Sequence, residues 1–182
     1  GITPTLKIIQ SDDKIIFKNN ESGFNADNID SICDISKSTK SNKNGIKGYI
    51  GEKGIGFKSV FRVSDSPEIY SNGYQFKFNS HSAIAGKKAG VKLGFILPEW
   101  IEEPDIEVEE KFTNIILPFR KSLLINEKLR LADIEPDLIL FLNKLQKLEI
   151  RNDQLKTKTK VSKIRKDSII TILQKTKIEG QK

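Results

Sequence analysis

Short runs that alternate hydrophobic and polar residues recur along the chain and predict a structure built mainly of β-strands. Residues 6–9 and 15–17 form two such runs around a polar turn, which predicts a β-hairpin. A second hairpin is predicted at residues 68–78, because Asn72-Gly73 suits a two-residue turn and aromatic residues alternate with polar ones after it. Further strands are predicted at residues 91–97, 112–119, 148–151 and 169–173.

Helical spacing of apolar residues is confined to three segments. Asn25 can cap a helix whose apolar side, including Ile29 and Cys33, follows a helical spacing. The glycine-rich residues 51–56 precede a spacing that predicts a second helix, and residues 133–145 predict a third. Strands outnumber helices, so the pattern predicts an α+β fold with a mixed, mostly antiparallel sheet.

Composition narrows the class of protein. The chain has 182 residues and 37% hydrophobic content, enough for the core of one domain. Charged residues make up 30% and no apolar run reaches the roughly 18 residues that span a bilayer. The chain has a single cysteine, which cannot close an intrachain disulfide. One cysteine and one histidine are too few ligands for a structural zinc site. We therefore expect an intracellular protein, cytoplasmic or nuclear, with no membrane partner and no metal ligand set.

The net charge of +7 lies in the last segment of the chain. Residues 151–182 carry ten lysines and arginines against three acidic residues, whereas residues 1–150 are neutral. This contrast predicts a domain over 1–150 and a basic C-terminal extension over 151–182, which could begin a following domain. The extension is either a nucleic-acid or anionic-lipid binding segment or a solvated strand or linker. No aromatic residue is interleaved for base stacking, so the sequence favours the second interpretation.

The glycine-rich segment is a candidate for phosphate binding. Gly51, Gly54 and Gly56 let the backbone approach an anion with its N–H groups, and the helix after them adds a positive end. Taken alone, this spacing of glycines is also typical of a turn that leads into a helix and binds no ligand. It matches neither the dinucleotide-binding fingerprint nor the P-loop.

Four segments taken in order are more specific than any one of them. Residues 19–24, 34–40, 51–61 and 113–118 resemble the successive ATP-site boxes of the GHKL superfamily of ATPases. Within that superfamily the chain is most similar to N-terminal domains of the sacsin and NO VEIN type, in residues 54–63 and 71–73. The resemblance extends over about residues 4–148.

This resemblance implies a Bergerat-type two-layer sandwich, with helices on one face of the sheet and ATP between them under a lid. Asn19 would receive the adenine amino group, Gly23 would form the turn under the base, and Thr113 would approach the adenine through its hydroxyl. The lid would contribute Lys37 and Ser38, and backbone N–H groups would reach the phosphates from Gly51, Gly54, Gly56 and Phe57. The implied ligands are ATP or ADP and Mg²⁺.

Two departures from the superfamily pattern affect the expected activity. Asn19 stands where the family usually has aspartate, and a neutral amide oxygen accepts a weaker hydrogen bond than a carboxylate. The family's first box, a helix with a catalytic glutamate and an Mg²⁺-binding asparagine, should precede the first strand, and residues 1–18 contain no glutamate. We therefore expect an N-terminally truncated domain of a larger ATPase, without catalytic residues of its own.

A second interpretation belongs to a different class of function. A non-catalytic protein-interaction module with a relic nucleotide pocket would also explain Asn19 and the missing catalytic helix. Binding of nucleic acid through the basic extension ranks below both. The acidic residues between 102 and 110 suggest a metal cluster by their number, but their alternation with apolar residues favours a solvated edge.

Overall fold

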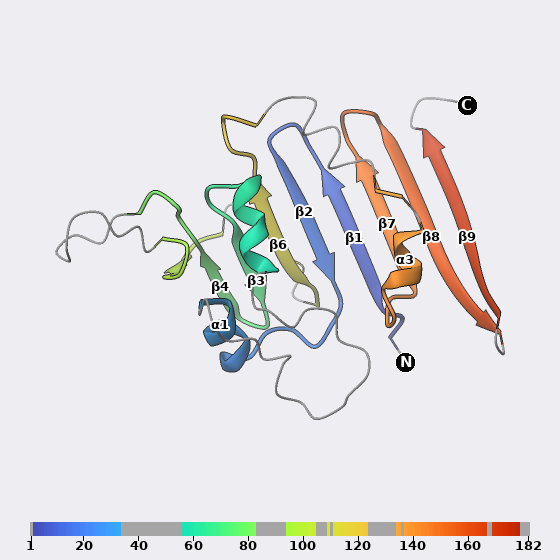
Figure 1. Cartoon of the computed structure of the whole chain (residues 1–182), viewed down its shortest axis with the longest axis horizontal. Helices are drawn as coiled ribbons and strands as arrows, with labels where there is room; N and C mark the ends of the chain where they lie inside the picture. Colours follow the sequence, from blue (N-terminus) through green and yellow to red (C-terminus); the bar gives the residue numbers. More distant parts are fainter. Residues whose placement is uncertain are drawn as a thin grey trace.

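Nine strands form one open sheet in the order β5-β4-β3-β6-β2-β1-β7-β8-β9 (Figure 1). The computed structural model describes residues 2–33, 56–82, 94–104, 109, 111–123, 134–135, 137–166 and 169–178. Neighbouring strands are antiparallel except β1 and β7, which are parallel. The prediction of a mixed, mostly antiparallel sheet is confirmed. The strands are β1 (Thr5–Gln10), β2 (Lys14–Asn19), β3 (Glu68–Ser71), β4 (Tyr74–Lys77), β5 (Glu99–Trp100), β6 (Thr113–Pro118), β7 (Lys147–Asn152), β8 (Thr157–Lys166) and β9 (Ile169–Ile178).

Both predicted hairpins are present. The first joins β1 to β2, with Ile8 opposite Phe17. The second joins β3 to β4 through Asn72 and Gly73, whose φ angles are 51° and 83°. Two consecutive positive φ angles are what the twist of a two-residue hairpin requires, so the Asn-Gly pair determines this turn.

The basic C-terminal segment also belongs to the sheet. β8 pairs with β7 and β9 pairs with β8, each antiparallel, and β9 extends to Ile178, beyond the predicted end at residue 173. Strand β7 spans residue 150, and the division into domains at that position stays a prediction. The segment forms strands, as one of the two interpretations expects, and the other interpretation, binding of nucleic acid or anionic lipid, stays a prediction.

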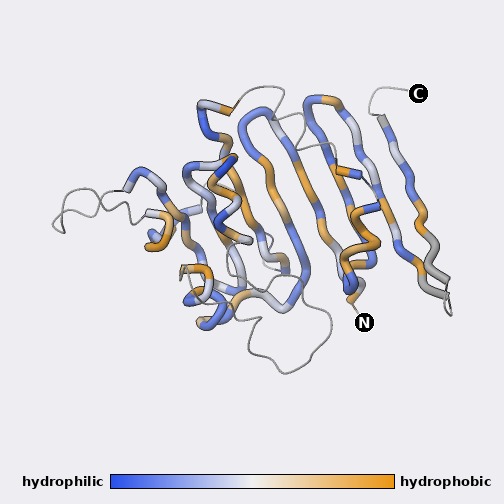
Figure 2. Tube along the Cα trace, in the orientation of Figure 1, coloured by the Kyte–Doolittle hydropathy of each residue, from blue (hydrophilic) through white to orange (hydrophobic). Residues whose placement is uncertain are grey.

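Three short helices pack on one face of the sheet (Figure 1): α1 (Ala26–Cys33), η1 (Phe57–Arg62) and α3 (Leu138–Phe141). One core cluster joins Ile139 of α3 and the partly buried Val60 of η1 to buried residues of β1, β2, β6, β7 and β8. A second cluster joins Ile29 of α1 and Phe61 of η1 to β3 and β4. Figure 2 shows hydrophobic residues along the central strands and on α3, and hydrophilic ones along the C-terminal half of β9.

The described structure is mostly β, and the last predicted helix is shorter than expected. The 3₁₀-helix η1 begins at Phe57, directly after Gly56, as the glycine-rich pattern predicts. The helix predicted at 133–145 is wrong in extent, since α3 ends at Phe141. Its early end follows from tertiary contacts, because the N–H groups of Gln146 and Lys147 both donate to the Pro4 carbonyl and draw the chain into β7.

The strand predicted at residues 91–97 is also wrong in its described part. Residues 94–97 form a turn, and the strand here is the two-residue β5 that follows. The carbonyl of Phe95 accepts a hydrogen bond from Lys58 Nζ, and the Phe95 ring packs edge-on against Phe61 with centroids 4.6 Å apart. Side-chain contacts therefore take the place of a strand ladder. No helix of the described residues combines the length and the apolar character needed to cross a membrane.

Candidate functional site

Three segments distant in sequence meet at one end of the sheet. Asn19 is the last residue of β2 and pairs directly with Thr113, the first residue of β6. Ser71, the last residue of β3, lies beside Thr113 with its Oγ 2.6 Å from Thr113 Oγ1. The predicted site residues Asn19 and Thr113 are thus brought together by strand register.

The Ser71–Thr113 hydroxyl pair is buried, with residue exposures of 4% and 2%. Ser71 Oγ also accepts the backbone N–H of Phe24 at 2.9 Å. One hydroxyl hydrogen is used between the two side chains, and the other remains for a further acceptor. A hydroxyl pair of this kind can pass one hydrogen bond to a bound base or to a water beside it.

Gly23 lies against the hairpin turn that follows Ser71. Its φ is +82°, and a Cβ at this position would lie 2.8 Å from Asn72 Cβ. Asn72 Nδ2 donates to the Phe24 carbonyl at 3.1 Å, which fastens the segment after β2 to the β3–β4 turn. Both the backbone angle and the close approach require glycine here.

Two adjacent asparagines at the end of β2 have different roles. Asn20 is structural, because its Oδ1 accepts the Thr5 N–H at 2.7 Å and its Nδ2 donates to the Thr3 carbonyl at 2.8 Å. Asn19 Oδ1 accepts only the N–H of Glu21, at 3.3 Å. Within the described residues, Asn19 Nδ2 contacts no acceptor, so this partly exposed amide keeps hydrogen-bonding capacity that Asn20 has used.

The glycine-rich segment enters the described structure at Gly56. This residue has φ −56° and ψ −49°, and a Cβ added to it would meet no atom of the described residues within 4 Å. The ring of Phe57 packs against Phe61 and Phe78, with centroids 6.5 and 5.6 Å away. Phe57 is therefore anchored in the core through its side chain. The predicted site residues outside the described part are Lys37, Ser38, Gly51 and Gly54.

Lys58, next to the glycine-rich segment, points into the protein. Its Nζ donates to the Ile32 carbonyl at 2.7 Å and to that of Phe95, and it lies 5.0 Å from the centre of the Phe78 ring. Burial lowers the pKa of Lys58, and it raises the pKa of the neighbouring Cys33 thiol. Lys58 thus ties α1 to the turn before β5, and this contact occupies its ammonium group.

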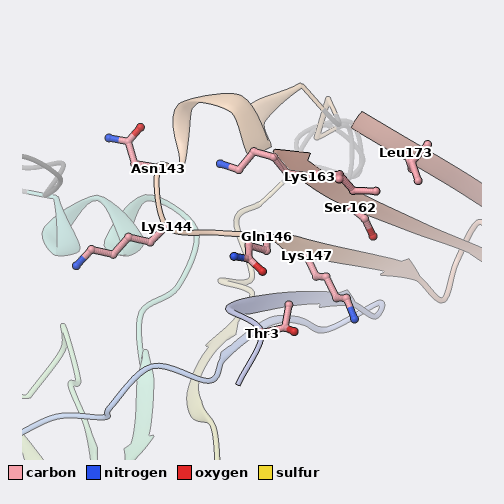
Figure 3. A pocket seen from close by; sticks show the side chains of 9 residues that line it. Thr3, Asn143, Lys144, Gln146, Lys147, Ser162, Lys163 and Leu173 are labelled. Carbon is pink, nitrogen blue, oxygen red and sulfur yellow. The ribbon is translucent and has the colours of Figure 1, made fainter. Parts of the chain in front are cut away.

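A hollow of about 610 Å³ lies elsewhere, between the residues before β7 and the β8–β9 hairpin (Figure 3). Among the described residues, the predicted site residues Asn19, Gly23, Gly56, Phe57 and Thr113 do not line it. Lys163, one of its lining residues, donates to the carbonyls of Ile139 and Leu142 at 3.1 and 2.8 Å, which holds the end of α3. We place the candidate site at Asn19 and Thr113, because polar groups from three segments converge there. The hollow is lined by Thr3, Asn143, Lys144, Gln146, Lys147, Ser162, Lys163, Ile164 and Leu173.

Sequence reasoning missed Ser71 and Asn72 as parts of this site. The Ser71-Asn72-Gly73 run was visible as a turn, but its contact with Thr113 and Gly23 depends on the β3–β6 pairing, which no local pattern reveals. Among the described residues, no group of three or more histidine, cysteine, aspartate or glutamate side chains gathers where it could hold a metal.

Comparison with known proteins gives one clear relation. No protein-family model matches the chain. The chain is 39% identical over 170 residues to Protein NO VEIN of Arabidopsis thaliana, an alignment that covers 83% of this chain. It is therefore homologous to a region of that protein. The chain spans only 6% of the length of this relative.

Proposed function

We propose that this chain is an ATP-binding domain of the GHKL type, with a Bergerat fold, within a longer protein related to NO VEIN. The observation that supports this most is the meeting of Asn19, Thr113 and Gly23 at one end of the sheet. These are the positions that the resemblance assigns to the adenine. Helices on one face of a mixed sheet are in keeping with that fold.

The donor and acceptor set at this end suits an adenine edge. The amide of Asn19 offers an acceptor for the exocyclic amine and a donor for a ring nitrogen. The remaining hydroxyl hydrogen of the Ser71–Thr113 pair reaches the base directly or through a water. Because Asn19 is neutral, its hydrogen bond to the amine is weaker than that of a carboxylate.

Gly56 supports the phosphate part of the proposal. Its backbone angles suit any residue, and the described structure leaves room for a Cβ. Glycine at this position is thus not explained by local packing, whereas an approaching phosphate oxygen would need the space. Further backbone contacts would come from Gly51 and Gly54, and lid contacts from Lys37 and Ser38.

Hydrolysis of ATP would need groups supplied from outside residues 1–182. The glutamate that activates water and the asparagine that holds Mg²⁺ belong to the helix that precedes the first strand in GHKL proteins. In our proposal the present chain binds the nucleotide, and Mg²⁺ is held jointly by the phosphates and that upstream helix. A bound Mg²⁺ would neutralise charge on the phosphates.

Titration with ATP, followed by amide chemical shifts in NMR spectra, tests this function. We expect binding near 1 mM, equivalent to about −4 kcal/mol, with the largest shifts at Asn19, Gly23, Gly56 and Thr113. Asn19→Asp should tighten binding, and Gly56→Ala should weaken it without loss of thermal stability. Thr159→Val is the control and should leave ATP binding unchanged, because the hydroxyl that it removes pairs with Thr176 at 3.1 Å on the β8–β9 hairpin, away from the candidate site.

Two results would count against ATP binding at the candidate site. One is the absence of shifts at 10 times the expected dissociation constant, both in this chain and in one extended upstream. The other is a set of shifts confined to the lysine-lined hollow beside α3. Either result would favour the non-catalytic interaction module. The observation that supports this alternative is that position 19 is asparagine, where the family usually has aspartate.

A further inference from the structure

The face of the sheet turned away from the helices carries lysines in directly opposed pairs. Core residues such as Ile8 and Val161 face the helices, and strand side chains alternate, so their neighbours face the other way. On that face Lys7 lies opposite Lys18, in the β1–β2 hairpin. Like charges placed directly opposite each other in adjacent strands destabilise a sheet. This pairing therefore requires a compensating anion.

One carboxylate compensates the pair on β1 and β2. Glu109 Oε2 lies 3.3 Å from Lys7 Nζ, and its Oε1 lies 2.8 Å from Lys18 Nζ. The hydrogen bond from Lys18 is the main reason that the pKa of Glu109 is lowered, with a smaller contribution from Lys7. The structure thus contains its own example of a carboxylate that joins two opposed lysines from above the sheet.

Two more opposed pairs lie on the β8–β9 hairpin. Lys158 is opposite Lys177, and Lys160 is opposite Lys175; we call these four residues the lysine ladder. Lys160 also lies opposite Glu149 of β7 and forms an ion pair with it, with Glu149 Oε1 3.7 Å from Lys160 Nζ. Among the described residues, no carboxylate forms an ion pair with the other three lysines of the ladder.

We propose that the lysine ladder is a docking surface for an acidic polypeptide segment in extended conformation. Its alternate carboxylates would lie between the lysines of each pair, as Glu109 does between Lys7 and Lys18. Successive pairs are two residues apart along the strand, about 6.6–6.8 Å. In an extended peptide, residues i and i+2 point to the same side and have the same spacing.

The surroundings of the ladder favour a peptide over a nucleic acid. No aromatic residue occurs in residues 151–182, so the hairpin offers no platform for base stacking. Ile164 and Leu173 lie on the same face beyond the ladder and are 47% and 51% exposed. An apolar side chain next to the acidic run of a peptide could bury this surface, whereas a phosphate backbone could not.

Fluorescence anisotropy with the full chain and defined probes tests the proposal. The probe is a labelled 12-residue peptide of alternating glutamate and threonine, in about 50 mM salt. We expect Lys175→Gln with Lys177→Gln to weaken binding at least tenfold. The control is the double variant Lys111→Gln with Lys121→Gln, in which both lysines are exposed and lie in turns. It removes the same charge and should change binding less than twofold.

A charge reversal separates docking from folding. Lys175→Glu with Lys177→Glu places opposite charges across both pairs, so it should abolish peptide binding and raise the melting temperature. The proposal is overturned if this variant still binds the peptide, or if the turn-lysine control loses as much affinity as the ladder variant. It is equally overturned if a peptide with the same composition but paired glutamates binds as well, or if duplex DNA of equal charge binds more tightly.

Discussion

Gly56, Gly73 and Gly23 differ in backbone angle and in the space around an added Cβ. Their alanine variants should therefore lose stability in a defined order, which tests the structure around the candidate site. At Gly56 the backbone is ordinary and the space is open. At Gly73 the φ is +83° but nothing lies within 4 Å of a Cβ. At Gly23 the φ is +82° and the Cβ would also lie 2.8 Å from Asn72 Cβ.

The expected losses of stability follow from these differences. An alanine held in the left-handed backbone region lowers the free energy of unfolding by about 1–2 kcal/mol. Replacing glycine by alanine also reduces the conformational entropy of the unfolded chain, which offsets about 0.4–1 kcal/mol of this loss. Gly73→Ala should therefore cost about 1 kcal/mol. Gly23→Ala adds overpacking, typically about 1–3 kcal/mol, for a total of roughly 2–4 kcal/mol. Gly56→Ala should lie within about 0.5 kcal/mol of the wild type.

Thermal unfolding measured by circular dichroism checks the ranking. For a chain of this size each kcal/mol lowers the melting temperature by roughly 2–4 °C. The melting temperature should fall by roughly 4–16 °C in Gly23→Ala, by a few degrees in Gly73→Ala and hardly at all in Gly56→Ala. Equal losses at positions 23 and 73 would refute the close packing of Gly23 on the β3–β4 turn. A large loss at position 56 would remove the argument that its glycine is kept for a ligand.

Two further predictions concern hydrogen bonds at either face of the sheet. Thr113→Val should cost about 1–3 kcal/mol of stability, because it leaves the buried Ser71 hydroxyl without this hydrogen-bond partner. Thr159→Val should cost much less, because its hydrogen bond to Thr176 is exposed; urea unfolding compares the two variants. Lys18→Gln should raise the pKa of Glu109 more than Lys7→Gln does, measured by NMR titration of the carboxyl carbon, and the reverse order would contradict the geometry. Because the folded pKa of Glu109 is lowered, its contribution is present above the unfolded pKa and is lost as pH falls through the folded value.

Local patterns predicted the elements that depend on neighbouring residues. The Asn72-Gly73 turn needs positive φ at two positions, and Asn25 accepts the Asn28 N–H at 3.0 Å as the predicted cap of α1. The antiparallel hairpins follow from the same short-range information. These are the places where turn chemistry and periodicity agree.

Elements that depend on distant contacts were predicted less well. The end of α3 is fixed by bonds to the first residues of the chain, and the turn before β5 is fixed by Lys58. Sequence order suggested that Asn19 and Thr113 share a site, but their direct pairing and the contact with Ser71 come from sheet register. The ligand roles of these residues stay predictions.

The parallel pairing of β1 with β7 has a consequence for how the chain acquires its shape. Thr5 is matched with Lys147, so this part of the sheet closes only after residue 147 has been synthesised. Contacts between such remote positions slow folding, since the loop between them must be ordered first. On a ribosome, the hairpin of β1 and β2 would emerge before both of its neighbours, so the edge of β2 stays unpaired until β6 is made and that of β1 until β7 is made. Nascent chains halted before residue 147 should therefore remain susceptible to proteases.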